Sequence, residues 1–232
     1  MILSRVAGVK FSQLPQLLDG LGAARGGGRW NPHGLPAVYL AELEATAVAE
    51  KAFYSIIIAA VDFNASLRAG QIRTLGERGF FADQPYVLSN IEFEEQQLNL
   101  ADISTDTEIA RWSKSIKLNL TFQECIHDKV FDIQHKTQEF ARLVREHGHN
   151  GLIVPSARHA GNCIVLFPDD FPNGIEASLR QQNRILISGL KRGSDIKYDP
   201  NADGPVNEGL VLMERMQMAG DRIDTTLIQI GR

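Results

Sequence analysis

The sequence predicts an α+β fold, because strand-like and helix-like segments follow one another irregularly along the chain. They lack the regular strand–helix–strand spacing that is typical of a doubly wound parallel sheet. Apolar residues make up 44% of the 232 residues, close to the globular average, so the chain can bury a sizeable core. The length fits one large domain, or one domain with an appendage.

The predicted strands are short runs in which apolar residues alternate or cluster. They cover residues 1–9, 36–41, 56–63, 98–103, 152–155 and 163–167. The β-branched run 56–63 is also compatible with a helix that continues from the segment before it. The run 152–155 stops at a proline, which cannot donate a backbone hydrogen bond to a sheet.

The predicted helices carry apolar residues at helical spacing or are rich in alanine and glutamate. They cover residues 11–21, 44–55, 137–146 and 208–218. The first of these contains Pro15, which limits it to a short helix or a turn. Helix N-cap signals at residues 104–108 precede a polar stretch, up to residue 133, that favours neither type of element.

Charge and cysteine content exclude several classes of protein. The formal net charge is −4 and no basic stripe stands out, which argues against bulk binding of nucleic acid. Cys125 and Cys163 lack metal-site spacing and the six histidines form no zinc motif, so we expect two buried thiols and no metal site. The longest apolar run, residues 56–61, is too short to span a bilayer, and no N-terminal leader is visible. We therefore expect a cytoplasmic protein that does not bind membranes.

The glycine-rich loop, residues 25–34, carries the clearest chemical signal. Its three consecutive glycines leave the backbone bare and free to adopt positive φ angles. Arg25 and Arg29 flank them, and each guanidinium can bind two oxygens of a phosphate or carboxylate. The loop lacks the spacing and the Gly-Lys-Ser/Thr ending of a Walker phosphate loop. With Tyr39 and Glu50 following closely, the segment suits an anionic ligand that carries a ring, for which a nucleotide is the natural candidate.

Five short motifs follow one another in a defined order over roughly residues 1–170. They are Gly27–Pro32, Val38–Ala41, Thr46–Glu50, Gly151–Arg158, and Asn162 with Val165–Pro168. Their order and spacing resemble the RES-domain family. The resemblance implies an ADP-ribosyltransferase-like split β-sandwich with flanking helices, which grips NAD in a cleft. It also implies the toxin of a bacterial toxin–antitoxin pair, whose antitoxin carries an Xre-like helix-turn-helix.

The resemblance assigns four residues to binding NAD. Arg29 matches the family arginine and would grip the pyrophosphate, where a planar guanidinium is a better fit than an ammonium. Arg5, on the first strand, would share this task. Tyr39 would stack on nicotinamide or hydrogen-bond through its hydroxyl, and Asn162 would add a hydrogen bond.

Catalysis is assigned by the same resemblance to Glu50, assisted by Arg29, Tyr39 and Ser156. Cleavage of the nicotinamide–ribose bond develops positive charge at the anomeric carbon, and an ionised carboxylate at Glu50 would stabilise it. Ser156 would orient the nicotinamide carboxamide or the ribose. It is not expected to act as a nucleophile, because no Gly-x-Ser-x-Gly elbow or triad accompanies it.

The expected function is therefore NAD degradation, as an NAD glycohydrolase or an NAD phosphorylase. NAD is the substrate, inorganic phosphate is a candidate co-substrate, and no other cofactor is expected. Residues 1–171 would form the RES domain, and residues 172–232 an extension packed on it. Two alternatives stay open: transfer of ADP-ribose to a macromolecule, and a module without turnover that binds a nucleotide or docks an antitoxin. A homodimer is also compatible with the sequence.

Overall fold

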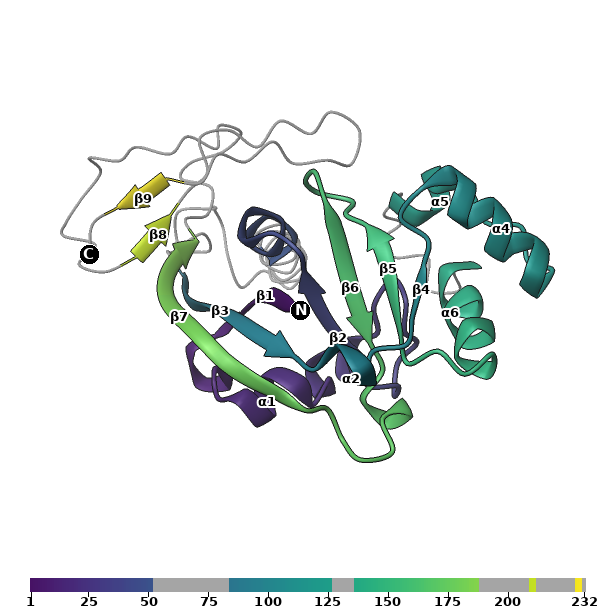
Figure 1. Ribbon diagram of the computed structural model, residues 1–232. Helices are drawn as coiled ribbons and strands as arrows, with labels where there is room; N and C mark the ends of the chain where they lie inside the picture. Colours follow the sequence, from purple (N-terminus) through teal and green to yellow (C-terminus); the bar gives the residue numbers. More distant parts are fainter. Residues whose placement is uncertain (52–83, 127–135, 188–208, 212–227, 231–232) are drawn as a thin grey trace, which may run out of the picture.

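One mixed β-sheet runs through the part of the chain that the structure describes, and helices pack against it (Figure 1). The computed structural model describes residues 1–51, 84–126, 136–187, 209–211 and 228–230. Within these ranges the strands lie in the order β4–β5–β6–β2–β1–β3–β7–β8–β9. They are β1 Ile2–Gly8, β2 Val38–Ala41, β3 Gln84–Phe93, β4 Leu100–Asp102, β5 Gly151–Pro155, β6 Asn162–Leu166, β7 Ala177–Ile187, β8 Gly209–Val211 and β9 Ile228–Ile230.

The sheet is nearly divided between β2 and β1. These two strands are antiparallel, but their register pairs only Ser4 with Ala41. By contrast, β1 pairs with β3 along the whole of Ile2–Gly8. The sheet therefore consists of one half from β4 to β2 and another from β1 to β9, in agreement with the predicted split arrangement.

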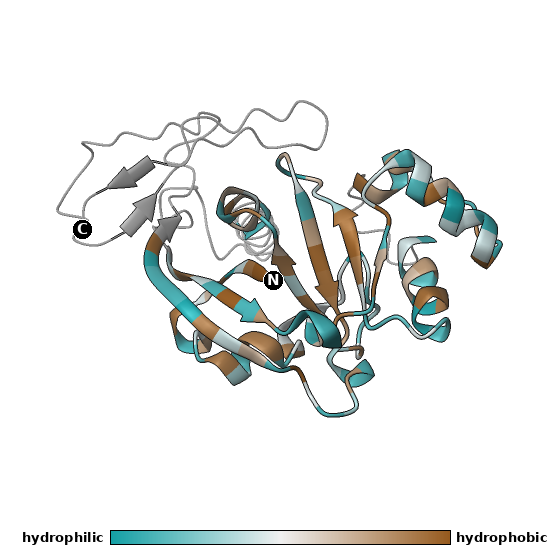
Figure 2. Cartoon of the chain, in the orientation of Figure 1, coloured by the Kyte–Doolittle hydropathy of each residue, from teal (hydrophilic) through white to brown (hydrophobic). Residues whose placement is uncertain are grey.

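Strand β6 is buried on both faces and separates two hydrophobic cores. Val165 belongs to the core that contains Trp30 and Phe140, whereas Ile164 belongs to the core that contains Leu17. This follows from the geometry of a strand, in which successive side chains point to opposite faces. Figure 2 shows the resulting apolar colouring of the neighbouring strands β5 and β6.

The helices flank this sheet. They are α1 Leu14–Leu18, α2 Leu21–Gly26, α4 Asp106–Ile116, α5 Phe122–Ile126 and α6 Lys136–Glu146, and residues 44–51 are helical as well. Figure 1 shows α4, α5 and α6 grouped beside β4 and β5. Thr105 caps α4, because its hydroxyl accepts a hydrogen bond of 3.3 Å from Glu108 N, which confirms the predicted cap. Among the described residues no helix is long and apolar enough to cross a membrane.

Two long strands, β3 and β7, lie where the sequence predicts none. They pair with each other along most of their length, so β7 extends the sheet beyond residue 171. Residues 180–184 of β7 are all polar and mostly exposed, and therefore lack the alternation that marks a strand. The pairing with β3 fixes this strand through backbone hydrogen bonds, which the side-chain pattern does not reveal.

The other predicted elements agree with the structure except near the C-terminus. The predicted helix over 208–218 is wrong at residues 209–211, which form β8 between β7 and β9, because pairing with two strands overrides local helix preference. The rest of that segment lies outside the described residues. So does the run 56–63, predicted as a strand.

Candidate functional site

The glycine-rich loop turns sharply at Gly27 and Gly28. Gly27 has a φ angle of +69°, which side chains disfavour. A Cβ atom on Gly28 would lie 2.5 Å from the Tyr39 hydroxyl oxygen and 2.6 Å from Asn31 Oδ1, which leaves no room for a side chain. The amide of Gly28 donates to Asn31 O over 2.8 Å and closes the turn. The glycines therefore let the chain turn tightly, as the sequence predicts.

The Tyr39 hydroxyl holds this loop from the side of the sheet. It accepts a hydrogen bond of 3.0 Å from Trp30 N and donates one of 2.8 Å to Asn31 Oδ1. Asn31 is completely buried, and its amide nitrogen in turn donates to the carbonyl oxygen of Leu35 over 2.9 Å. In the structure, the hydroxyl thus serves the shape of the loop.

Arg29 is held from the side of the helices. The Thr137 hydroxyl, in the first turn of α6, donates to Arg29 O over 2.6 Å. The Arg29 guanidinium donates through Nη1 to the carbonyl oxygen of Cys125, in α5, over 2.9 Å. Arg25, by contrast, lies exposed on α2. Of the two arginines in the loop, Arg29 is thus the one whose side chain is held in a fixed direction. It is also the one that matches the family arginine.

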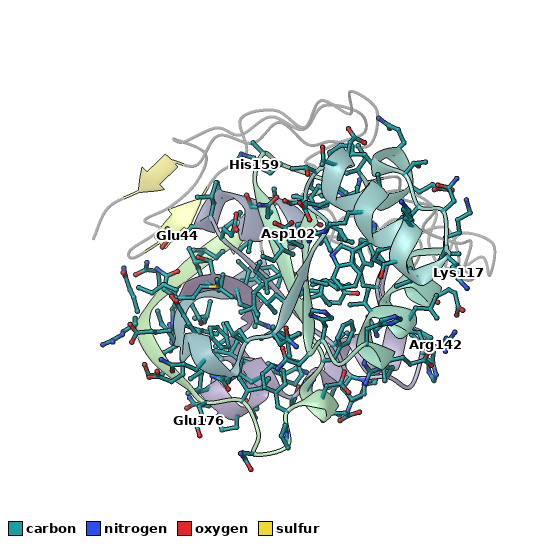
Figure 3. The ribbon with its side chains drawn as sticks, turned by 45° about the vertical axis from the view of Figure 1, so that its right-hand side comes forward. Glu44, Asp102, Lys117, Arg142, His159 and Glu176 are labelled. Carbon is teal, nitrogen blue, oxygen red and sulfur yellow. The ribbon has the colours of Figure 1, made fainter. Side chains whose placement is uncertain are left out.

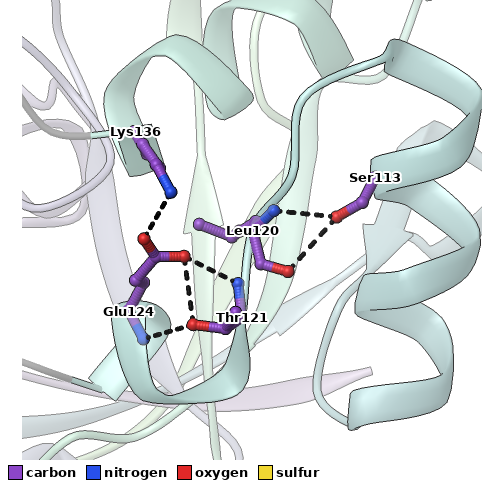
Figure 4. Close-up of polar contacts among 5 residues, drawn as sticks. All are labelled: Ser113, Leu120, Thr121, Glu124 and Lys136. Atoms are coloured by element: carbon purple, nitrogen blue, oxygen red, sulfur yellow. Dashed lines mark hydrogen bonds and ion pairs between the residues drawn. The ribbon is translucent and has the colours of Figure 1, made fainter.

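Helix α5 is itself anchored by a reciprocal cap at its first turn (Figure 4). The Thr121 hydroxyl accepts from Glu124 N over 3.2 Å, and Glu124 Oε2 accepts from Thr121 N over 2.9 Å. Lys136, at the start of α6, donates to Glu124 Oε1 over 2.6 Å. This ion pair and the Thr121 hydrogen bonds lower the pKa of Glu124.

Glu50 and Ser156, two of the four predicted catalytic residues, are in direct contact. The Ser156 hydroxyl donates to Glu50 Oε1 over 2.6 Å, and the amide of Ala157 donates to the same oxygen over 3.1 Å. Ser156 is almost completely buried, whereas Glu50 is partly exposed. Among the described residues the hydrogen bonds to this carboxylate all end on Oε1. The second oxygen, Oε2, is thus available for other contacts in this part of the chain.

The Ser156 hydroxyl has no capacity left for another strong partner. Its oxygen accepts from the amides of Arg158 and His159, both over 3.1 Å. A hydroxyl has one proton and two lone pairs, so these two bonds and the bond to Glu50 use all three. The hydroxyl therefore orients the Glu50 carboxylate, and the geometry gives it no free proton for a ligand.

Cys163, on β6, lies beside the Glu50–Ser156 pair. Its thiol lies 3.8 Å from Glu50 Oε1. Burial and the charge of Glu50 raise the pKa of Cys163 well above its usual range, although the positive charge of Arg29 partly opposes them. The thiol is thus protonated at neutral pH and unsuited to nucleophilic attack.

Arg5, on β1, and Lys51, which follows Glu50 in the sequence, are two further buried cations. Burial lowers the pKa of Arg5 to about 10, with a small opposing influence of Asp19. Burial, and then the charge of Arg5, lower the pKa of Lys51. Lys51 Nζ also lies 5.1 Å from the centroid of the Tyr86 ring.

Asn162 lies at the start of β6, next to Cys163, and successive side chains of a strand point to opposite faces. Its side-chain amide donates to Glu42 Oε2 over 3.0 Å, and its carbonyl oxygen accepts from Glu42 N over 3.2 Å. The Asn162 side chain thus contacts Glu42, while its backbone pairs with Pro155, the residue before Ser156. The turn between β5 and β6, which carries Ser156, also carries His159, seen in Figure 3 at the opposite end of the molecule from Glu176.

Several residues of the site are absent from the sequence prediction. Lys51 directly follows Glu50, and Arg158, completely buried, follows Ser156 by two positions. Both residues could have been proposed from the sequence, because they lie next to residues that match the family pattern. Thr137 and Cys163 give no such signal, because their roles depend on packing between distant segments. Within the described residues no group of three or more histidine, cysteine, aspartate or glutamate side chains is placed to hold a metal ion.

Comparison with known proteins agrees with this reading of the fold. The family model described as the RES domain matches residues 2–186. Among solved structures, the chain is similar to the MbcT toxin in the crystal structure of the M. tuberculosis MbcT–MbcA toxin–antitoxin complex. The TM-score is 0.51 and the identity 20%, and the match covers 79% of this chain and 83% of that chain. This likeness confirms the predicted fold class, which is α+β and ADP-ribosyltransferase-like. No curated protein matches the sequence. Because the family model spans well over half of the sequence, the chain belongs to the RES-domain family.

Proposed function

We propose that the protein degrades NAD by cleaving its nicotinamide–ribose bond. The observation that carries the proposal is the hydrogen-bonded pair of Glu50 and Ser156, in which one carboxylate oxygen is fixed by the hydroxyl and by the amide of Ala157. A carboxylate that receives two donors on one oxygen is held in one orientation. Such a group is suited to a reaction that develops positive charge.

The reaction needs a fixed negative charge more than it needs an acid. As the bond to nicotinamide breaks, the ribose takes on oxocarbenium character, and the Glu50 carboxylate stabilises it. Nicotinamide leaves as a neutral base, so no strong proton donor is required. Ser156 acts by holding Glu50, and water or inorganic phosphate takes the ADP-ribosyl group.

Arg29 and Arg5 are the proposed grip on the pyrophosphate. Arg29 has a fixed direction because Cys125 O accepts from it, and Arg5 lies on the first strand close enough to influence Lys51. Guanidinium groups bind adjacent phosphate oxygens in a defined geometry. Tyr39 keeps the loop of Arg29 in shape through its hydroxyl, and its ring is the proposed stacking partner of the nicotinamide. We retain Asn162 as an outer contact for the ligand, although its amide binds Glu42 in the structure.

We further propose that the protein is the toxin of a toxin–antitoxin pair and acts in the cytoplasm. The support is membership of the RES-domain family and the likeness to a chain whose structure is titled as a toxin–antitoxin complex. An antitoxin, expected to carry an Xre-like helix-turn-helix, would block access to Glu50. Loss of cellular NAD would then explain growth arrest in the absence of the antitoxin.

The test is turnover of NAD by the purified chain, with and without inorganic phosphate. Free ADP-ribose indicates hydrolysis, a phosphorylated ADP-ribose indicates phosphorolysis, and a labelled protein indicates transfer. Glu50→Gln removes the charge and keeps the shape, so we expect activity to fall by about a hundredfold or more. Glu94→Gln is the matched control, since Glu94 is exposed. Absence of NAD loss in the unsubstituted chain, or equal activity of Glu50→Gln and Glu94→Gln, would overturn the proposal.

A further inference from the structure

A second contact joins the turn between β5 and β6 to the helical segment that carries Glu50. Thr46 is completely buried, and its hydroxyl donates to Ala160 O over 2.7 Å. Thr46 and Glu50 are four residues apart, so they lie on the same face of the helix. The turn is therefore fastened at both ends: Glu50 binds its start at Ser156, and Thr46 binds its end at Ala160.

The fit of the turn against Thr46 is close. The Thr46 hydroxyl also lies 3.2 Å from His159 Nδ1. Gly161 has a φ angle of +97°, and a Cβ atom there would lie 3.3 Å from Thr46 Oγ1 and 3.2 Å from Leu43 Cδ1. The Thr46 hydroxyl is thus surrounded by three consecutive residues of the turn, one of which has little space for a side chain.

From this geometry we propose that Thr46 is a positioning residue, which sets the place of the Ser156 hydroxyl relative to Glu50. The inference rests on the proposed function, because it concerns the same carboxylate. The Ser156 oxygen is held by the amides of Arg158 and His159, which belong to the turn. A shift of the turn therefore moves that oxygen with it. The Thr46 hydroxyl binds Ala160 O and not the Glu50 carboxylate, so it acts through the backbone of the turn.

The first test compares Thr46→Val with Thr46→Ser in NAD turnover. Valine keeps the shape and removes the hydroxyl, whereas serine keeps the hydroxyl. We expect Thr46→Val to lower kcat by about tenfold, the usual worth of one such hydrogen bond, with KM unchanged and with kcat largely restored in Thr46→Ser. In the background of Ser156→Ala, Thr46→Val should cost little more, because the group that it positions is already absent.

The second test needs no activity. Hydrogen exchange of the backbone amides in the turn should be faster in Thr46→Val than in the unsubstituted chain, and close to normal in Thr46→Ser. The contact with Ala160 is at an exposed residue, so water can replace the lost donor and the fold should survive. Unchanged exchange and unchanged kcat in Thr46→Val would overturn the inference, as would a fall in kcat that Ser156→Ala does not suppress. If the unsubstituted chain consumes no NAD, the proposed function fails and exchange alone decides whether Thr46 fixes the turn.

Discussion

Arg29 and Cys125 are 96 residues apart in the sequence, yet the guanidinium of one donates to the carbonyl oxygen of the other over 2.9 Å. Through this bond, α5 sets the direction of the cation that we propose to bind the pyrophosphate. The helix itself has five residues and depends on the reciprocal cap of Thr121 and Glu124. The orientation of the Arg29 guanidinium therefore depends on the stability of the first turn of α5.

Replacement of Arg29 by lysine should weaken NAD binding. An ammonium has neither the planar fork that binds two phosphate oxygens nor the reach to bind Cys125 O at the same time. We expect KM for NAD to rise by about tenfold to a hundredfold, measured from initial rates. Arg25→Lys is the matched control, because Arg25 lies exposed on α2, and its KM should not change. Equal effects of the two variants would contradict the role given to Arg29.

Disruption of the α5 cap should also change the orientation of the Arg29 guanidinium. Thr121→Ala removes the hydroxyl that accepts from Glu124 N, and should cost about 1 kcal/mol of stability. Thr105→Ala removes the corresponding cap of α4 and should cost a similar amount. Both variants should lower the midpoint of urea unfolding, but only Thr121→Ala should raise KM for NAD. A rise of KM in both would indicate a general effect of lower stability.

The two glycines at either end of the sharp turn should respond in opposite ways to alanine. Gly28→Ala places a Cβ atom 2.5 Å from the Tyr39 hydroxyl oxygen, so it should destabilise the fold by about 2 kcal/mol or more and reduce activity. Gly26→Ala has nothing within 4 Å and lies in α2, so it should be neutral or slightly stabilising. Thermal unfolding of both variants measures the contrast. A Gly28→Ala protein of normal stability would show that the loop is less closely packed than the structure indicates.

The buried thiols predict a loss of stability at alkaline pH. Burial raises the pKa of Cys125 to about 12 from an ordinary value of 9, so the folded state keeps a proton that the unfolded state releases. The resulting stability is fully present below pH 9 and declines as the pH rises toward 12. Cys125→Ala should therefore show a shallower decline of the unfolding free energy between pH 8 and 11 than the unsubstituted chain. A parallel decline in both proteins would contradict this origin.

The same burial predicts slow chemistry at both cysteines. Because the pKa of Cys163 is raised well above its usual range and its thiol is covered, a thiol reagent at pH 8 should label it only after unfolding. Mass spectrometry of the labelled peptides distinguishes Cys163 from Cys125. Rapid labelling of Cys163 in the folded chain would show that this thiol is accessible to solvent.

The parts of the fold that the sequence predicts are those in which side-chain pattern and burial agree. Strand β6 is almost wholly apolar because both of its faces are covered, and α6 has a clear apolar stripe, so both are found from the pattern. Strand β7 is not, since residues 180–184 are polar and the strand is held by its pairing with β3. Pairing between distant segments has no local signal.

For the site, the sequence predicts the residue types better than their partners. The family pattern identifies Glu50 and Ser156, and the structure brings them into contact. It gives no indication that the Ser156 hydroxyl accepts from two backbone amides and donates to Glu50. That fact depends on the backbone of the turn, and turn geometry is not readable from residue types alone.

The pairing of Glu50 with Ser156 also has a consequence for synthesis of the chain. The carboxylate is made 106 residues before the hydroxyl that orients it. The turn is held in the sheet by β6, which lies between β5 and β2, so it takes its place only once residue 166 has left the ribosome. The oriented pair of Glu50 and Ser156 therefore forms only late in translation, after most of the chain has been synthesised.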